Sequence, residues 1–559
     1  MQPTVAANLH HLIRDAIIRK TPIISLPPGT HHIHGALLPE RFCHVTNNDH
    51  GLKRILLDVN GAHDLTIDGN GATLVIHGEI IPIAIKNSAT VTVKNLTIDW
   101  HRPAFTQATV TASGAGFLEF RTDLKRYPLR VSAHRLIAED GEGWKSESLW
   151  NLLPFDKNGE IPAKHENWHL INFHKASVKG DIFRLEAAFA ETHPEGTTIA
   201  LMHGNRVAPA VWIEDSEHIT VQDITIHHAM GMGVVAQLSK NVTVERVTIA
   251  PSGDRLFSTW VDAVHMCDCS GATRVIDCRL RGQFDDAINL HASFSKVIPH
   301  GAPNRAILQL VHPQRYGDSP AKIGLDVAFY RRADLGRVLV TRVTDAARIN
   351  QESTGITVAD ALPTDQGDLV CGVFDPSGTV EIRGNFFGPN RGRGILINLE
   401  HHVTIANNHF HVSGRAIESQ PDANYWWEGS PVRDLTIRDN HLDDCGYGPC
   451  GDDAIFIGPE LPDGADPRNG PLRETHSESA AHAAENTAVG SAIGAVTITG
   501  NRITHHRGRF LHAHGIANLT VTGNRLDHSG RYPQQARGIA IDLGPGIGAA
   551  NVTAPDGWA

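Results

Sequence analysis

The feature that most limits how this chain can fold is a short sequence pattern that returns at a constant spacing. Each copy alternates aliphatic and polar residues and favours β-branched side chains, which indicates a strand with one buried face. Three neighbouring pairs of copies start at positions 219 and 242, 380 and 403, and 496 and 519, so the period is 23 in each pair. One strand-rich coil of that length stacked on the next predicts an all-β fold, a right-handed parallel β-helix.

Asparagine recurs at the end of many copies of this pattern. A buried amide at the same place in successive coils can hydrogen-bond to its neighbours, so we expect a structural ladder in the turns rather than functional side chains. The asparagines expected in this ladder are Asn70, Asn408, Asn440, Asn501 and Asn524.

The repeat is interrupted twice. The pattern that contains Leu96 next returns at Ile224, and the one near Cys278 next returns at Asn385, so each gap is several times longer than one coil. Because the interrupting sequences read as strands and turns, they predict two inserted β-barrel or β-sandwich domains. The expected order is an N-terminal cap with the first coils (1–102), an insert (103–205), coils that carry acids (206–294), a second insert (295–375), and C-terminal coils (376–559) with a long loop at 459–493.

The start of the chain and its charge exclude several classes of protein. The opening segment, Met1 to Lys20, reads as a short amphipathic helix covering the open end of the β-helix, and it lacks the basic segment and apolar block of a secretory leader. No run approaches the roughly 18 apolar residues of a membrane span, so we expect no membrane partner. A net charge of −11 argues against nucleic acid as a partner.

The cysteines and the surface add three expectations. Seven cysteines at irregular spacing do not make a disulfide framework, and Cys267-Asp268-Cys269 lacks the second pair that a zinc site would need. Buried free thiols or one local disulfide are the expected states, with no resident metal and no cofactor. Pairing of two chains as a homodimer through an exposed face of an inserted barrel stays open.

Adjacent acids stand out in the strand-like run Phe284–His291 (FDDAINLH). Asp262 precedes Asp285 by one full period, so we expect the two to stack on neighbouring coils about 4.8 Å apart, with Asp286 beside them. Three carboxylates this close repel one another, and at least one should hold a proton near neutral pH. Glycosidases use a protonated acid that faces a carboxylate base. The expected spacing of these three acids alone is compatible with both inverting and retaining enzymes.

Two other interpretations of the acids stay open. An Asp-Asp pair at a coil corner can be a solvated turn. It can also bind calcium, in which case Asp268 and Asp277 are candidates for the further oxygen ligands.

Candidate substrate-binding residues surround the acids in the sequence. The run Asp422–Gly429 holds three consecutive aromatic residues, whose rings could stack on a sugar or pack against an inserted domain. Polar residues that follow the acid pair at alternating positions, or that lie at nearby coil ends, could bond sugar hydroxyls. The full set of candidates is Asn289, His291, His265, Arg393, Glu418, Tyr425, Trp426, Trp427 and Glu428.

The acid run, Asp262 one period earlier, Arg393–Ile397 and Asp422–Glu428 together resemble family 110 of the glycoside hydrolases. That resemblance implies an exo-acting α-1,3-galactosidase that removes terminal α-galactose, including from blood-group B antigens, with inversion and without a cofactor. It implies that Asp285 is the general acid and that Asp262 and Asp286 activate water. It also implies export with a leader.

Two rival functions remain from the sequence. A polygalacturonase-like β-helix hydrolase would share the stacked aspartates, but it would need a basic subsite, and its Gly-His-Gly and Arg-Ile-Lys signatures do not occur here. A non-catalytic adhesin or tailspike-like protein would use the long wall only to bind glycans. The adhesin interpretation predicts that the acid cluster is solvated and dispensable for binding.

Overall fold

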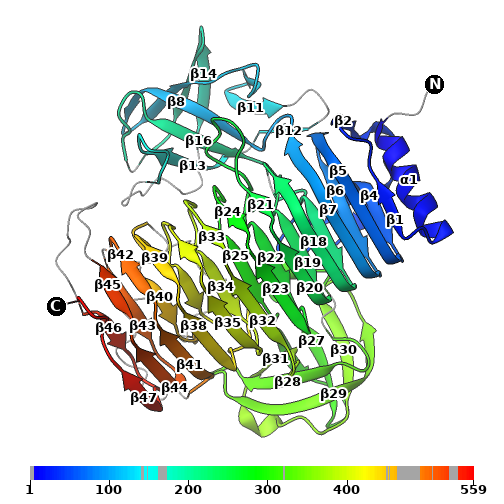
Figure 1. Ribbon diagram of the computed structural model, residues 1–559, viewed down its shortest axis with the longest axis vertical. Coiled ribbons are helices and arrows are strands. Elements are labelled where there is room, and N and C mark those ends of the chain that lie inside the picture. Colours follow the sequence, from blue (N-terminus) through cyan, green and yellow to red (C-terminus); the bar gives the residue numbers. More distant parts are fainter. Residues whose placement is uncertain are drawn as a thin grey trace.

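One helix caps the N-terminal end of the molecule. The computed structural model describes residues 5–139, 144–147, 149–161, 173–189, 191–204, 206–318, 321–448, 451, 453–462, 491–506, 508–527 and 539–558. Helix α1 (Val5–Arg19) buries Leu9, Ile13 and Ala16 against the first coils, as its helical spacing of apolar residues predicts. Figure 1 shows α1 at one end of a long stack of strands, the place at which the sequence predicted a cap.

Two large sheets form the walls of a parallel β-helix, as the sequence period predicts. Among the described residues, one sheet has 20 strands and the other has 12. The larger sheet contains β1 (Ile23–Ser25), β2 (Thr30–His34), β5 (His63–His77), β7 (Ala89–Trp100), β18 (Glu217–Ile226), β20 (Lys240–Glu245), β21 (Thr248–Ile249), β23 (Ala272–Ile276), β24 (Arg279–Leu280), β32 (Thr379–Arg383), β33 (Phe386–Phe387), β35 (His402–Ala406), β36 (His409–Phe410), β38 (Asp434–Arg438), β39 (His441–Asp443), β41 (Ile493–Thr499), β42 (Arg502–Thr504), β44 (Ile516–Thr522), β45 (Arg525–Asp527) and β47 (Ala549–Val552). The smaller sheet contains β3 (Glu40–Cys43), β4 (Gly51–Asn60), β6 (Ile80–Lys86), β17 (Val211–Glu214), β19 (Val234–Gln237), β22 (Val264–Cys267), β25 (Ile288–His291), β34 (Ile395–Asn398), β37 (Ile417–Ser419), β40 (Asp453–Ile457), β43 (Arg509–Ala513) and β46 (Ile541–Leu543).

The register of the larger sheet follows the sequence period. Ile219 pairs with Val242, Val380 with Val403, and Val496 with Leu519, all in parallel and all one sequence period apart. These aliphatic side chains are buried, so each coil adds one layer to a continuous core between the walls. Burial of apolar area contributes roughly 25 cal/mol per Å², which makes this core the main source of stability.

An asparagine ladder runs through one corner of the coils. From Asn408 onward, the amide oxygen of each asparagine accepts the backbone N–H and the side-chain Nδ2 of the asparagine one coil earlier, at 2.9–3.0 Å. The members are Asn385, Asn408, Asn440, Asn501 and Asn524. Asn70 was expected here, but it is exposed and its backbone N–H bonds to Asp68 instead, so that prediction is wrong.

The two interruptions form separate β structures (Figure 1). The first consists of a six-stranded antiparallel sheet and a three-stranded sheet, made of β8 (Phe105–Gly114), β9 (Phe117–Arg121), β13 (Leu149–Phe155), β14 (Lys175–Lys179), β15 (Ile182–Glu186) and β16 (Thr198–His203), and of β10 (Leu129–Ser132), β11 (Arg135–Glu139) and β12 (Lys145–Ser146). The second is a closed barrel of β26 (Ser295–Pro299), β27 (Arg305–Gln309), β28 (Asp326–Arg331), β29 (Arg337–Arg348), β30 (Ser353–Val358) and β31 (Leu369–Val373). Short 3-10 turns are η1 (Gly35–Leu37), η2 (Pro313–Arg315) and η3 (Thr364–Gln366). The loop predicted at 459–493 lies mostly outside the described residues.

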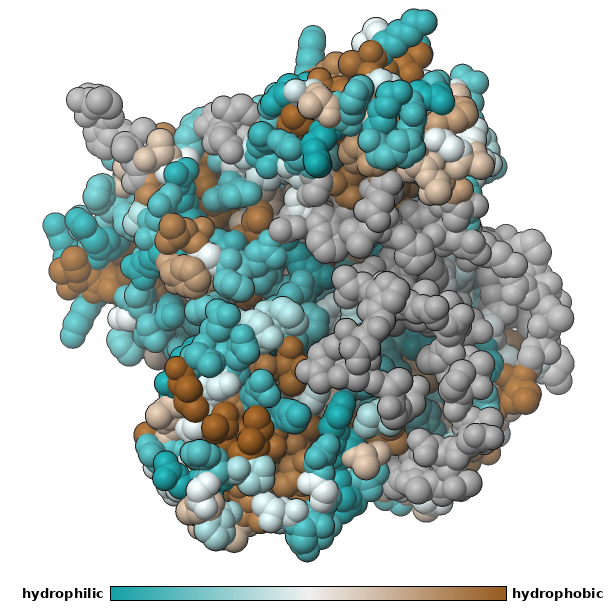
Figure 2. All heavy atoms as spheres, turned by 180° about the vertical axis from the view of Figure 1, so that it is seen from behind, coloured by the Kyte–Doolittle hydropathy of each residue, from teal (hydrophilic) through white to brown (hydrophobic). Residues whose placement is uncertain are grey.

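The surface and the cysteines complete the picture. Figure 2 shows hydrophobic side chains gathered near the bottom of the molecule, the end at which Figure 1 places the second barrel. Large apolar side chains exposed on this barrel include Ile298, Ile323, Val340 and Ile349. The six cysteines in the described part of the chain are buried and free; Cys450 lies outside it. None of the described helices is long and apolar enough to cross a membrane.

Candidate active site

The three predicted acids lie together at a corner of neighbouring coils, immediately before β22 and β25. Val264 pairs with Ile288, so the coil at this place is one residue longer than the sequence period. The expected stacking of Asp262 on Asp285 is therefore wrong, because the register aligns Asp262 with Asp286. The backbone N–H of Asp286 donates to Asp262 Oδ1 at 3.0 Å, which ties the two coils together at this point.

The carboxylates nevertheless converge. One oxygen of each of Asp262, Asp285 and Asp286 lies within 4.8 Å of the others. Asp262 is 4% exposed and Asp286 1%, whereas the Asp285 side chain is 29% exposed. Of the three acids, only Asp285 is therefore partly open to solvent, and the other two carboxyl groups are buried.

Arg393, which precedes β34 on the next coil, holds Asp286 in place. Its Nε and Nη2 donate to the two oxygens of Asp286 at 2.9 and 2.8 Å, and its backbone N–H donates to Oδ1 at 2.8 Å. Its Nη1 donates to Glu418 at 2.7 Å, and Arg415 donates to the other oxygen of Glu418 at 2.7 Å. Glu418, which the sequence predicted to bind substrate, is 2% exposed, and its carboxylate accepts from two guanidinium groups and so positions Arg393.

Asp285 is bordered by a tight backbone contact and by two cations. A Cβ on Gly392 would lie 2.5 Å from the carbonyl carbon of Asp285, so only glycine lets the next coil pack this closely. Arg206 Nη2 lies 3.9 Å from one oxygen of Asp285, and Arg391 Nη1 lies 3.8 Å from the other. Sequence reasoning missed Arg206, which follows the first insert and belongs to no repeated pattern.

Burial and mutual repulsion shift the protonation of the cluster. Burial raises the pKa of Asp262, and the charge of Asp285 raises it further. Burial also raises the pKa of Asp286 to about 8, although the Arg393 guanidinium acts to lower it. Because interacting carboxyl groups titrate as a unit, the cluster keeps a proton at neutral pH.

Two histidines lie behind Asp262. His265 Nδ1 is 2.8 Å from Asp262 Oδ2, and the Nε2 atoms of His265 and His291 are 3.1 Å apart. Burial lowers the pKa of both imidazoles to about 4, which makes them neutral near pH 7. Both rings, which the sequence predicted to bond sugar hydroxyls, are fully buried, and they contact Asp262 and each other.

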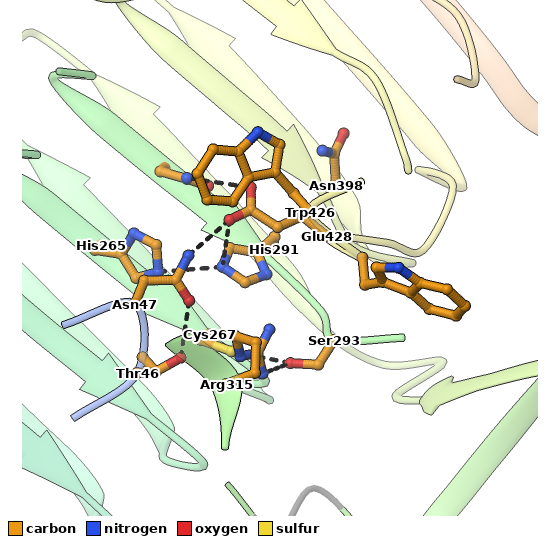
Figure 3. Close-up of polar contacts among 12 residues, drawn as sticks. Thr46, Asn47, His265, Cys267, His291, Ser293, Arg315, Asn398, Trp426 and Glu428 are labelled. Atoms are coloured by element: carbon orange, nitrogen blue, oxygen red, sulfur yellow. Dashed lines mark hydrogen bonds and ion pairs between the residues drawn. The ribbon is translucent and has the colours of Figure 1, made fainter. Parts of the chain in front are cut away.

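Glu428 closes the other side of this histidine pair. Its carboxylate accepts Asn47 Nδ2 at 2.7 Å and Asn289 Nδ2 at 3.4 Å, and it lies 3.6 Å from His291 Nε2. Figure 3 shows Asn47 and His291 pointing toward Glu428 from different segments. Glu428 is 6% exposed and Asn289 is equally buried, with its amide oxygen unpartnered among the described residues. Asn47 comes from the first coils, before the regular repeat, and sequence reasoning missed it.

The predicted aromatic segment divides between surface and core. Asp422 accepts the backbone N–H groups of Asn424, Tyr425, Trp426 and Trp427, which curls the segment into a tight loop. Tyr425 and Trp426 remain half-buried, and the Trp426 ring lies 4.6 Å from the ring of His312, which the second insert supplies.

Trp427, which the sequence predicted to contact the substrate, lies on the buried side of this loop. It packs with Phe294 and Tyr330 against the second barrel and is only 4% exposed. The guanidinium of Arg332 lies 5.3 Å from the centroid of its ring. Trp427 therefore fulfils the packing alternative that the sequence left open for this segment.

The second insert is anchored to the wall beside the site. Arg315 is buried and bonds to Asp318 at 2.8 Å and to Ser293, and Asp318 accepts Thr46 Oγ1 at 3.1 Å. Asp268, which the calcium interpretation would use, instead accepts Ser293 N at 2.7 Å and Ser293 Oγ, and it lies 3.4 Å from Arg315. Asp268, one of the two candidate ligands in that interpretation, is thus bound to Ser293 and Arg315.

A parallel β-helix that carries a proton-holding acid cluster and partly exposed aromatic rings is the arrangement of a glycoside hydrolase. Alpha-1,3-galactosidase A of Shewanella woodyi is 30% identical to this chain over 446 residues, which cover 77% of this chain and 72% of that protein. Alpha-1,3-galactosidase B of Bacteroides thetaiotaomicron is also 30% identical, over 416 residues that cover 72% of this chain and 67% of that protein. The chain belongs to the α-1,3-galactosidase family, family 110 of the glycoside hydrolases.

The remaining comparisons are more distant. No protein-family model matches the sequence. Among solved structures, the mannuronan C-5 epimerase AlgE6 A-module of Azotobacter vinelandii aligns over 99% of this chain and 96% of its own, with a TM-score of 0.37 and 9% identity. The catalytic unit of a GH87 α-1,3-glucanase from Streptomyces thermodiastaticus aligns over 98% of this chain and 67% of its own, with a TM-score of 0.35 and 11% identity.

Proposed function

We propose that the protein hydrolyses the terminal, non-reducing α-1,3-linked galactose of oligosaccharides or glycans, with inversion of the anomeric configuration. The observation that carries this proposal is the group of three carboxylates within 4.8 Å of one another, of which only Asp285 is partly exposed. Relatives at 30% identity are named α-1,3-galactosidases, which supports the sugar and the linkage.

Asp285 acts as the general acid that protonates the glycosidic oxygen. Its side chain is the exposed one, so it can approach an oxygen at the sugar's edge. General acid catalysis of this kind contributes roughly 10²–10⁴ in rate. Protonating Asp285 also removes the negative charge that raises the pKa of both Asp262 and Asp286.

Asp262 and Asp286 orient and deprotonate the attacking water. Neither carboxyl group is placed to attack the sugar itself, because both are nearly buried. The oxygens of Asp262 contact His265 and the backbone N–H of Asp286. Both oxygens of Asp286 accept hydrogen bonds from Arg393. A retaining enzyme needs an exposed second carboxylate as nucleophile. Its absence among the described acids of this cluster favours attack by water and therefore inversion.

The galactose ring stacks on Trp426, which the ring of His312 supports from the second insert. Arg206 and Arg391, on either side of Asp285, supply polar groups for the ring hydroxyls. The adhesin interpretation expects a solvated acid cluster, whereas Asp262 and Asp286 are buried, and this favours catalysis over simple glycan binding.

The linkage is tested with three disaccharides that share a terminal α-galactose. We expect release of galactose from α-1,3-galactobiose at least about 100-fold faster than from the α-1,4- and α-1,6-linked isomers, because only one linkage places its oxygen over Asp285. Galactose release is measured enzymatically at equal substrate concentration. Faster hydrolysis of either isomer would overturn the linkage, and binding without release from any of the three would support the glycan-binding alternative.

A further inference from the structure

We propose that the chain Asp262–His265–His291 stores one proton beyond those of two neutral imidazoles, and that this stored proton supplies the acid step. The inference deepens the proposed function, because it concerns the same acid cluster. It makes His265 and His291 positioning residues that act through Asp262.

The number of protons follows from three contacts in a row. Asp262 Oδ2 meets His265 Nδ1 at 2.8 Å, His265 Nε2 meets His291 Nε2 at 3.1 Å, and His291 Nδ1 meets the carbonyl oxygen of Ala292 at 2.8 Å. Each contact is short enough to need one hydrogen between its two atoms, since facing lone pairs would repel. Three contacts therefore need three protons, and two neutral imidazoles supply only two.

The backbone carbonyl fixes the direction of the chain. A carbonyl oxygen only accepts, so the proton of His291 lies on Nδ1. A neutral His291 then accepts at Nε2, and His265 must donate from its own Nε2. That leaves His265 Nδ1 as an acceptor facing Asp262, and the third proton lies in this last contact.

The environment places the third proton on Asp262. Both rings are fully buried, and burial lowers their pKa to about 4, so an imidazolium is disfavoured in either position. Burial raises the pKa of Asp262. The Asp286 N–H already donates to Oδ1 of Asp262, which leaves Oδ2 as the oxygen that carries the proton toward His265.

Other charges face the chain from several segments. The carboxylate of Glu428, 3.6 Å from His291 Nε2, is the group that would stabilise an imidazolium there instead. The ionisable groups that act on Asp262, His265 or His291 are Asp285, Asp286, Glu428, Asp318, Arg206 and Arg315.

The stored proton balances the proposed reaction. As the glycosidic bond breaks, the proton of Asp262 passes through Asp285, whose carboxyl group has an oxygen within 4.8 Å of it, to the leaving oxygen. Asp262, now ionised, takes a proton from the water whose oxygen bonds to the anomeric carbon. One C–O bond breaks and one forms, and Asp262 regains the proton that it gave up.

The direct test is a neutron structure of the free protein at neutral pH after exchange into D₂O. We expect deuterium on Asp262 Oδ2, on Nε2 of His265 and on Nδ1 of His291. Deuterium on His265 Nδ1 together with an Asp262 carboxylate that carries none would overturn the proposal. The absence of deuterium between the Nε2 atoms of His265 and His291 would overturn it as well. This readout needs no substrate, so it is independent of whether the protein cleaves α-1,3-galactosides.

A variant tests the effect on catalysis. A Gln at position 291 can donate or accept, so His291→Gln frees His265 to donate from Nδ1 to an ionised Asp262, which then loses its proton more easily. We expect the alkaline limb of the pH profile of kcat/KM to move to lower pH by about one pH unit. His506→Gln, a change to a buried histidine near the C-terminal end, should leave the profile unmoved. An unmoved limb in His291→Gln would contradict the proposal, and if that variant fails to fold, the neutron result decides.

Discussion

Replacing Asp285 with Asn is expected to lower kcat on α-1,3-galactobiose by about 10³-fold, while the protein stays folded. The amide is the same size as the carboxyl group and cannot deliver a proton to the leaving sugar. Because the side chain is 29% exposed and its two arginine contacts are long, at 3.8 and 3.9 Å, the change costs little stability. Initial rates of galactose release give kcat, and circular dichroism checks the fold.

A second substrate separates the acid from the base. p-Nitrophenyl α-galactoside has a leaving group that needs little protonation, so Asp285→Asn should lose far less activity on it than on the disaccharide. Asp262→Asn should lose activity on both substrates alike, because water must be activated in either case. Equal losses on both substrates for Asp285→Asn would show that Asp285 is not the acid.

Replacing Arg393 with Leu is expected to lower the free energy of unfolding by about 3–5 kcal/mol and to abolish most of the activity. The change leaves the buried carboxylate of Asp286 without its bidentate partner and leaves Glu418 with Arg415 alone. Burial acts to raise the pKa of Glu418, but Arg393 and Arg415 together lower it to about 2. Urea unfolding monitored by tryptophan fluorescence measures the stability change.

The matched control is an exposed pair with the same geometry. Arg246 donates from Nε and Nη2 to the two oxygens of Asp223 at 2.8 and 2.9 Å, but on the surface of the β-helix. Water solvates both charges there, so Arg246→Leu should leave the unfolding midpoint close to that of the wild type. Similar losses for the two variants would mean that burial of the Arg393 pair is not what makes it important.

The sequence predicted the β-helix and the gathering of the acids because both follow from a periodic burial pattern. The register predicted at the acids was wrong. Val264 pairs with Ile288, so this coil is one residue longer than the sequence period. The corners between strands change length from coil to coil, and the period does not report that change. The neighbouring steps along the smaller sheet differ too: Val234 pairs with Val264, and Ile395 with Ile417. A period measured elsewhere therefore could not decide which acid of the pair faces Asp262.

Burial of the functional candidates was the other limit. His265 and His291 are close to the acids in sequence, but their rings are buried. Residues of the second insert and of the first coils cover this part of the β-helix. Residues that cover it, such as Asn47 and Arg315, lie far apart in the sequence and follow no common spacing. Only the packing of the inserts on the β-helix brings them together, and no local pattern encodes that packing.

The most direct measurement of the central claim is proton NMR of galactose in the first minutes of α-1,3-galactobiose hydrolysis. Attack by water that Asp262 and Asp286 activate inverts the anomeric carbon and must produce β-galactose first. The α-anomer should then appear only at the rate of mutarotation. First-formed α-galactose would contradict the account, because it would require a covalent intermediate with a carboxylate that the two buried acids are not placed to form.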